Sequence, residues 1–113
     1  MPGKRLRPGN PEASSREAPR KIRWLRRALA NLDAEAEYIS RDSYASAQRV
    51  VTQIEQAVER LACHPALGRA GRVAGTRELV VAGTPYIIPY RVREGRVEIL
   101  RVFHAARKWP PKS

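Results

Sequence analysis

The chain has 113 residues, a net charge of +11 and 42% hydrophobic residues, which fits one domain with a single core. No apolar run approaches the ~20 residues of a membrane-spanning helix, and the basic start lacks the apolar stretch of a secretory signal, so we expect a soluble, cytoplasmic protein. Cys63 is the only cysteine, which excludes an internal disulfide. It ends an apolar helical pattern and is expected to be a buried structural thiol.

The positive charge is concentrated at the two ends of the chain. Residues 1–23 carry seven Lys/Arg and two Asp/Glu, residues 24–64 carry five and six, and residues 65–113 carry ten and three. Such a one-sided distribution attracts polyanions or an acidic protein by long-range steering. Solubility alone is the alternative, and it explains isolated charges better than this concentration.

The N-terminal segment differs in composition from the rest. Residues 1–20 hold four of the nine prolines and almost no apolar residue, so we predict a flexible basic arm, or a start codon assigned too far upstream. The folded domain is then residues 21–113. It begins with KIRWL at 21–25, a short strand that places Ile22 and Trp24 on one face.

Two amphipathic helices are predicted next. The first, of about four turns, has an apolar stripe formed by Leu25, Leu29, Leu32, Ala36 and Ile39, and Asp33, Glu35 and Glu37 lie mostly off this stripe. Asp42 or Ser43 ends it and caps the second helix, which stops at His64-Pro65. The single apolar face of the second helix is formed by Ala47, Val50, Val51, Ile54, Ala57, Val58 and Leu61. The two helices form a hairpin whose apolar faces need a common partner.

The last third supplies that partner as strands. After a glycine-rich loop at 68–75, strands are predicted at 76–82, 86–93 and 96–103, with a tight turn at Glu94-Gly95. Pro89 conflicts with a central strand, because it lacks an N–H and belongs at an edge or a bulge. The fold class is therefore α+β, with an N-terminal helical hairpin packed on a small antiparallel sheet.

This order of elements, with the segments GRAGRVAGTRELVV, GTPYIIPYRV and VEILRVFHAARKWP, resembles the RelE/ParE superfamily of toxins from type II toxin–antitoxin modules, also known as plasmid stabilisation proteins. The resemblance covers about residues 21–110. It implies a growth-inhibiting toxin that a cognate antitoxin silences by wrapping the sheet and helices. RelE-like members cut messenger RNA on the ribosome, whereas ParE-like members poison DNA gyrase.

The candidate site residues follow from these two targets. RNA cleavage requires a base for the 2′-hydroxyl and cations for the phosphorane, for which His104, Arg107 and Arg77 are the catalytic candidates. Arg77 could instead pair with Glu78, and His104 could be a packed strand-end residue. The candidates for contact with RNA or another target are Arg91, Arg93, Arg101, Lys108, Trp109 and Tyr86, where an aromatic ring would stack on a base. Arg91 and Arg93 share a face, which is equally consistent with a solvated surface.

Two departures weaken the case for a ribonuclease and favour the ParE-like branch or an uncharacterised one. RelE-like enzymes commonly carry an arginine three residues before the tyrosine of the middle strand, and Ile87 stands at that place. Their lysine-rich run on the preceding strand is replaced by Arg77 alone. We therefore expect a toxin that poisons DNA gyrase, with a ribosome-dependent mRNA endonuclease as the alternative. We expect no cofactor and no metal, because the two histidines are far apart and the carboxylates lie mostly on helices.

Overall fold

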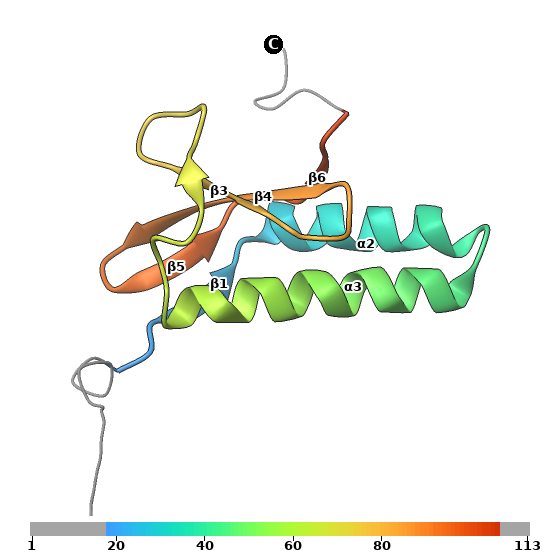
Figure 1. Ribbon diagram of the computed structural model, residues 1–113, viewed down its shortest axis with the longest axis horizontal. Coiled ribbons are helices and arrows are strands. Elements are labelled where there is room, and N and C mark those ends of the chain that lie inside the picture. The colour runs from blue at the N-terminus through green and yellow to red at the C-terminus, as the bar shows by residue number, and fades with distance from the viewer. Residues whose placement is uncertain (1–17, 107–113) are drawn as a thin grey trace, which may run out of the picture.

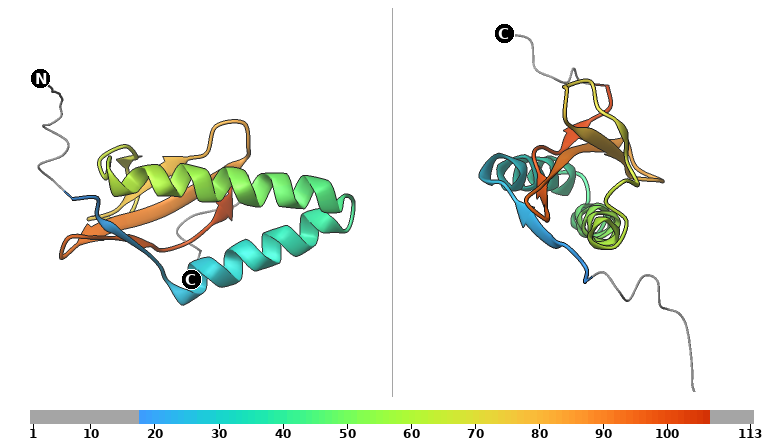
Figure 2. Two further views of the ribbon diagram at one scale, coloured as in Figure 1. Left: turned by 90° about the horizontal axis from the view of Figure 1, so that it is seen from below. Right: turned by 90° about the vertical axis from the view of Figure 1, so that its left-hand side faces the viewer.

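The computed structural model describes residues 18–106, so most of the predicted arm lies outside the described residues. The elements in chain order are β1 (Lys21–Trp24), α2 (Arg26–Ser40), α3 (Tyr44–Glu59), the 3-10 turn η1 (Arg60–Ala62), β2 (Arg69–Ala70), β3 (Arg77–Val80), β4 (Tyr86–Arg93), β5 (Arg96–Ile99) and β6 (Phe103–His104). The two helices form a hairpin on one side of the sheet (Figures 1 and 2). The predicted α+β class is confirmed.

Helix α2 places only part of the predicted stripe in the core, namely Leu32 and the partly buried Ile39. Its buried residues are Ala28, Leu32 and Glu35, whereas Leu29 is 47% exposed. Glu35 was expected off the apolar face, but its carboxylate accepts a hydrogen bond from the Tyr86 hydroxyl at 3.0 Å. Because that hydrogen bond satisfies the buried carboxylate, the helix can turn Glu35 towards the sheet and expose Leu29.

Helix α3 follows its prediction closely. The Ser43 hydroxyl accepts a hydrogen bond from the Ser46 N–H at 3.1 Å, as expected of an N-cap. The buried residues of α3 are Ala47, Ile54, Ala57 and Val58, all from the predicted apolar face. The apolar periodicity of this segment thus predicted both the helix and its buried side.

Neither helix in the described part of the chain is long and apolar enough to cross a membrane.

The sheet has the order β1-β5-β4-β3-β2, with β6 also paired to β4. The antiparallel meander β3-β4-β5 was predicted, but the sheet is not wholly antiparallel, because β1 pairs in parallel with β5. A parallel pair requires a long crossover connection, and the helical hairpin lies within this one. The N-terminal strand therefore completes the edge beyond β5.

A bulge explains how Pro89 fits a central strand. Tyr90 pairs with Ile99 and Ile87 with Phe103, so two residues on β4 face three on the partner strand. The predicted third strand is split here into β5 and β6. The Pro89 carbonyl accepts a hydrogen bond from the Leu100 N–H at 2.9 Å. In an antiparallel pair the N–H and the C=O of one residue point to the same neighbouring strand. The side on which Pro89 lacks an N–H is therefore the side of the bulge.

Alternation along β4 divides the core from the opposite surface. Tyr86, Ile88 and Tyr90 face the helices and join the core cluster, together with Val97 and Ile99 of β5. The turn after β4 has positive φ at both Glu94 (52°) and Gly95 (74°), the geometry of a type I′ hairpin. This turn fixes the register, and with it the set of residues that point away from the helices.

Candidate functional site

The sheet surface turned away from the helices is basic, as the charge distribution predicted. Register places Arg91 and Arg93 of β4 on this outer face, beside Arg96 and Glu98 of β5. Arg23 of β1 lies next to Glu98 in the same row. Arginines therefore outnumber carboxylates across three neighbouring strands.

One end of the sheet forms an open groove of about 850 Å³, which we call the arginine groove. It lies between the start of α2, the β2–β3 loop, the end of β4 and the bulge. Its basic lining residues are Arg26, Arg27, Arg91, Arg93 and Arg101. The other lining residues are Leu25, Val73, Ala74, Gly75, Thr76, Val92 and Leu100. The groove can therefore offer guanidinium groups and aliphatic surface to one ligand.

Glu98 fixes one of these arginines. Its carboxylate accepts a hydrogen bond from Arg91 Nε at 2.7 Å, although Glu98 is buried. The hydrogen bond from Arg91 is the main cause that lowers the pKa of Glu98, and the charges of Arg91, Arg93 and Arg23 lower it further. Glu98 thus stays ionised and holds the Arg91 guanidinium in place.

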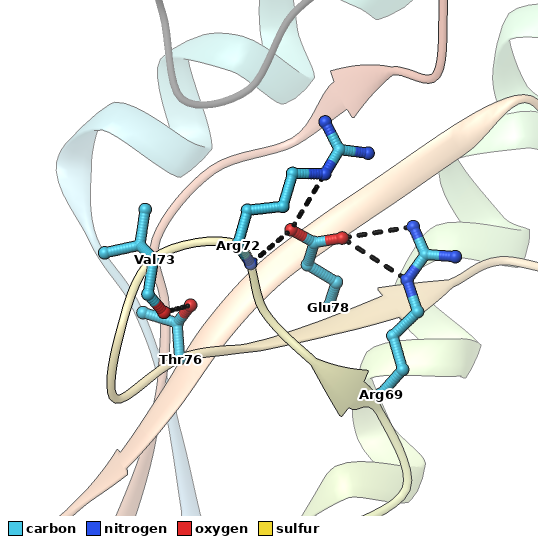
Figure 3. Close-up of polar contacts among 5 residues, drawn as sticks. All are labelled: Arg69, Arg72, Val73, Thr76 and Glu78. Carbon is cyan, nitrogen blue, oxygen red and sulfur yellow. Dashed lines mark hydrogen bonds and ion pairs between the residues drawn. The ribbon is translucent and has the colours of Figure 1, made fainter.

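A second buried carboxylate, Glu78, holds the loop that walls the groove (Figure 3). Glu78 is 1% exposed; Oε1 accepts hydrogen bonds from Arg69 Nε and Nη2 at 3.3 and 3.1 Å, and Oε2 accepts one from the Arg72 N–H at 3.2 Å. Arg72 Nε lies 3.6 Å from Oε2. The loop is closed by a 2.6 Å hydrogen bond from Thr76 Oγ1 to the Val73 carbonyl. We call this group the Glu78 clamp.

The clamp replaces the Arg77–Glu78 pair considered from the sequence. Adjacent residues of a strand point to opposite faces, so these two side chains cannot meet. The Arg77 guanidinium instead donates a hydrogen bond to the Gly68 carbonyl at 2.7 Å and a longer one to the Ala66 carbonyl at 3.4 Å. Arg77 therefore ties β3 to the segment before β2.

The Glu78 clamp predicts a measurable loss of stability on Glu78→Gln. The glutamine amide has only one acceptor oxygen. It can accept a hydrogen bond from Arg69 or from the Arg72 N–H, but its NH2 group then faces the other donor. Because both guanidinium groups are about half exposed, water screens part of the loss, and we expect the free energy of unfolding to fall by about 1–2 kcal/mol. Urea unfolding measures it. Glu37→Gln, which removes the exposed pair with Arg41, is the matched control, and an equal effect of the two changes would contradict the prediction.

The structure does not bring the predicted catalytic residues together. Arg77 pairs with Tyr90 and His104 with Tyr86, on opposite edges of β4 and four residues apart, or about 13 Å along the strand. His104 Nδ1 accepts a hydrogen bond from the Ala106 N–H at 3.1 Å, and its ring contacts Tyr86 edge-on at 5.6 Å. The remaining catalytic candidate, Arg107, and the contact candidates Lys108 and Trp109 lie outside the described residues.

Two expectations about single residues were wrong. Tyr86 cannot stack on a base, because its ring is 3% exposed and its hydroxyl is bound to Glu35 beneath the sheet. Cys63 is exposed rather than buried, since the helical pattern ends in η1 and Cys63 follows it as the C-cap. Among residues 18–106, no three His, Cys, Asp or Glu side chains gather in a way that suits a metal ion.

Arg26 and Arg27, which were not predicted as site residues, join the groove from the first turn of α2. A signal was present, because cations are disfavoured at a helix N-terminus and this first turn contains no acidic residue. The Glu78 clamp was missed as well. Its arginines come from β2 and the following loop, and only the register of β2 with β3 brings Arg69 opposite Glu78.

Comparisons with known proteins agree with this architecture. Residues 22–109 match the family model described as the ParE toxin of the type II toxin–antitoxin system parDE. Y4kP of Sinorhizobium fredii, a protein assigned as a toxin, is 53% identical over 80% of this chain and 94% of its own length. Toxin RelE2 of Caulobacter vibrioides is 45% identical over 74% of this chain and 93% of its own length.

Two solved structures share the fold. A chain of the chromosomal ParDE toxin–antitoxin system of P. aeruginosa superposes with a TM-score of 0.69 and 30% identity, covering 75% of this chain and 95% of that chain. A chain of the RelBE2 toxin–antitoxin complex of Mycobacterium tuberculosis gives a TM-score of 0.58 and 24% identity, covering 76% and 98%.

The helical hairpin on a meander sheet with a basic outer face is thus the fold of a type II toxin of the RelE/ParE superfamily. Within it, the chain belongs to the ParE toxin family, whose model spans nearly all of the described residues.

Proposed function

We propose that this toxin acts in the cytoplasm, inhibits growth by poisoning DNA gyrase and is neutralised by a cognate antitoxin. The match of residues 22–109 to the ParE family model carries the proposal. The ribonuclease candidates support it indirectly, because Arg77 is bound to backbone carbonyls and is separated from His104. Ile87, at the place of the RelE-like arginine, is buried.

The outer face supplies the groups for target contact. We assign this contact to Arg93 and Arg101 of the arginine groove, where Arg91 is held by Glu98 as a fixed neighbour. The tail residues Arg107, Lys108 and Trp109, which lie outside the described part of the chain, are assigned to the same contact. A target with anionic surface, such as a protein–DNA complex, would be attracted by this arrangement.

The test is to separate damage to DNA from arrest of translation. Purified full-length toxin is added to gyrase, ATP and relaxed plasmid, and we expect supercoiling to be lost and cleaved plasmid to accumulate. In cells, induction of the chain alone is expected to switch on a DNA-damage reporter before protein synthesis falls. Normal supercoiling with full growth inhibition would overturn the proposal.

The alternative is a ribosome-dependent mRNA endonuclease. One observation favours it, namely the 45% identity with a protein named toxin RelE2. Its signature would be cuts at fixed codon positions in translated messages, mapped by primer extension soon after induction, while gyrase remains active. The same induced culture therefore distinguishes the two functions.

A further inference from the structure

The charged side chains that line the arginine groove all have one sign. The described lining contains arginines and no acidic residue. Arg26, Arg27 and Arg93 form no hydrogen bond or ion pair within the described part of the chain. Glu98, the carboxylate beside this row, is already bound by Arg91. The groove therefore offers guanidinium groups to an anion from outside the described chain.

The surroundings of these arginines strengthen their positive potential. Leu25, Val73 and Val92 are among the aliphatic walls of the groove, and walls of low dielectric focus the field of nearby charges. The positive end of the α2 dipole adds to the charge of Arg26 and Arg27 in the first turn. Cations at this end do not favour the helix, so helix stability does not explain the two arginines.

The chain itself cannot supply the anion. Residues 1–17 carry four Lys/Arg and two Asp/Glu, and residues 107–113 carry three Lys/Arg and no acid. A second copy is equally unsuitable, because each copy has a net charge of +11. The occupant is therefore another molecule with concentrated negative charge.

The groove suits an anion that is recognised by charge alone. Apart from the arginines, Thr76 is the one polar side chain of the described lining, and its hydroxyl donates to the Val73 carbonyl. No amide or carboxylate side chain of this lining can select a particular peptide sequence. Phosphates, by contrast, repeat at regular intervals along a nucleic acid and are bound without regard to sequence.

The lining and the shape favour a duplex over a single strand. Single strands are usually bound by aromatic side chains on which bases stack, and the described lining has no aromatic residue. The base edges of duplex DNA lie about 8.5 Å deep in the major groove, where a protruding helix or ribbon reads them. A hollow surface instead receives the convex sugar–phosphate backbone.

We propose that the arginine groove binds the sugar–phosphate backbone of duplex DNA without reading its sequence. The choice of DNA over duplex RNA rests on the proposed function, because gyrase acts on DNA. Arg26 and Arg27 thereby extend the contact that was assigned to Arg93 and Arg101. Arg91, which Glu98 holds in place, adds a guanidinium of fixed position. A toxin that contacts DNA and enzyme together binds their complex better than it binds either alone.

The salt dependence of binding tests this site in purified full-length toxin. Fluorescence anisotropy follows a labelled DNA duplex of about 20 base pairs between about 50 and 200 mM salt. Each phosphate contact contributes about −0.9 to the slope of log K against log salt concentration. We therefore expect Arg26→Gln with Arg27→Gln to make the slope less steep by about two and to weaken binding at least about tenfold.

The matched control is Arg41→Gln with Arg49→Gln, which removes the same charge from exposed positions on the helical hairpin. We expect this variant to change the slope by less than about half a unit and binding by less than about twofold. Urea unfolding of the Arg26→Gln/Arg27→Gln chain is expected to be unchanged or to need slightly more urea, because the change removes cations from a helix N-terminus. A marked loss of stability would make these arginines structural and overturn the proposal.

Other occupants give different outcomes in the same assay. Equal changes of slope in both double variants would mean that net charge alone attracts DNA. Tighter binding of single-stranded DNA or of duplex RNA would assign the groove to another nucleic acid. Displacement of the duplex by polyglutamate as effectively as by unlabelled duplex at equal charge would make it a general polyanion site. A strong preference for one duplex sequence would mean that bases are read. Each result overturns the proposal.

The binding assay contains neither gyrase nor cells, so it fails independently of the proposed function. Loss of supercoiling caused by a toxin that does not bind the duplex would remove the DNA contact and leave gyrase as the target. Duplex binding that depends on Arg26 and Arg27, in a toxin that leaves gyrase active, would keep the DNA contact and remove gyrase.

Discussion

Tyr90→Ala is expected to lower the free energy of unfolding by about 3–5 kcal/mol, among the largest effects of any single change in this domain. Tyr90 is fully buried in the centre of β4 and belongs to the core cluster between sheet and helices. Its hydroxyl donates a hydrogen bond to the Pro65 carbonyl at 2.7 Å and accepts one from the Gly68 N–H at 2.8 Å. Truncation therefore opens a cavity and leaves two backbone groups without partners.

Two further variants separate these contributions in urea unfolding. Tyr90→Phe keeps the ring and removes only the hydroxyl, so we expect a loss of about 1–3 kcal/mol. Burial raises the pKa of Tyr90, which keeps the hydroxyl protonated as the donor to Pro65. Tyr44→Ala, at a 69% exposed position, should cost within about 0.5 kcal/mol. A Phe variant as unstable as the Ala variant would assign the whole effect to the hydrogen bonds and contradict the cavity argument.

Gly68 shows why the segment before β2 is tied so closely to Tyr90. A Cβ at this position would lie 2.7 Å from Tyr90 Cε1 and 2.9 Å from the Glu78 carbonyl oxygen. Only glycine lets the backbone approach the tyrosine hydroxyl at hydrogen-bonding distance. The same residue offers its carbonyl to Arg77, so the position joins β3, β4 and the loop.

Local periodicity was sufficient for most elements of the fold. The strand at 86–93 and the turn at Glu94-Gly95 appear as predicted, because alternation and a glycine at positive φ are encoded within a few residues. The parallel pairing of β1 with β5 was not accessible in this way, since it depends on where the helical hairpin returns the chain. Pro89 was expected at an edge or a bulge, and the pairing of both neighbouring strands was needed to decide between the two.

The candidate site was predicted less completely, because a period of two does not say which face is covered. Arg91 and Arg93 were correctly placed on one face. Tyr86 was assigned to target contact, yet it lies on the covered face, where Glu35 of α2 meets it. Arg26 and Arg27 come from a segment far from β4 in the sequence, and only the tertiary fold unites them in one groove.

Reversing two charges in the groove is expected to abolish toxicity. Arg93→Glu with Arg101→Glu places carboxylates where the proposed target contact requires cations, and like-charge juxtaposition at an interface costs several kcal/mol, which corresponds to at least roughly 100-fold weaker binding. We therefore expect colony counts after induction to recover by about two orders of magnitude. Because Arg101 has further contacts within the fold, circular dichroism and urea unfolding must accompany the assay.

The matched control is Arg41→Glu with Arg49→Glu, which changes the net charge equally on the helical hairpin, where both arginines are exposed. This variant is expected to remain toxic, since the long-range attraction that it loses affects the rate of encounter more than the final contact. Full toxicity of a folded Arg93→Glu/Arg101→Glu chain would remove the groove from the mechanism. Equal loss in both variants would assign toxicity to net charge, whereas selective loss in the groove variant would support Arg93 and Arg101 as groups that contact the target.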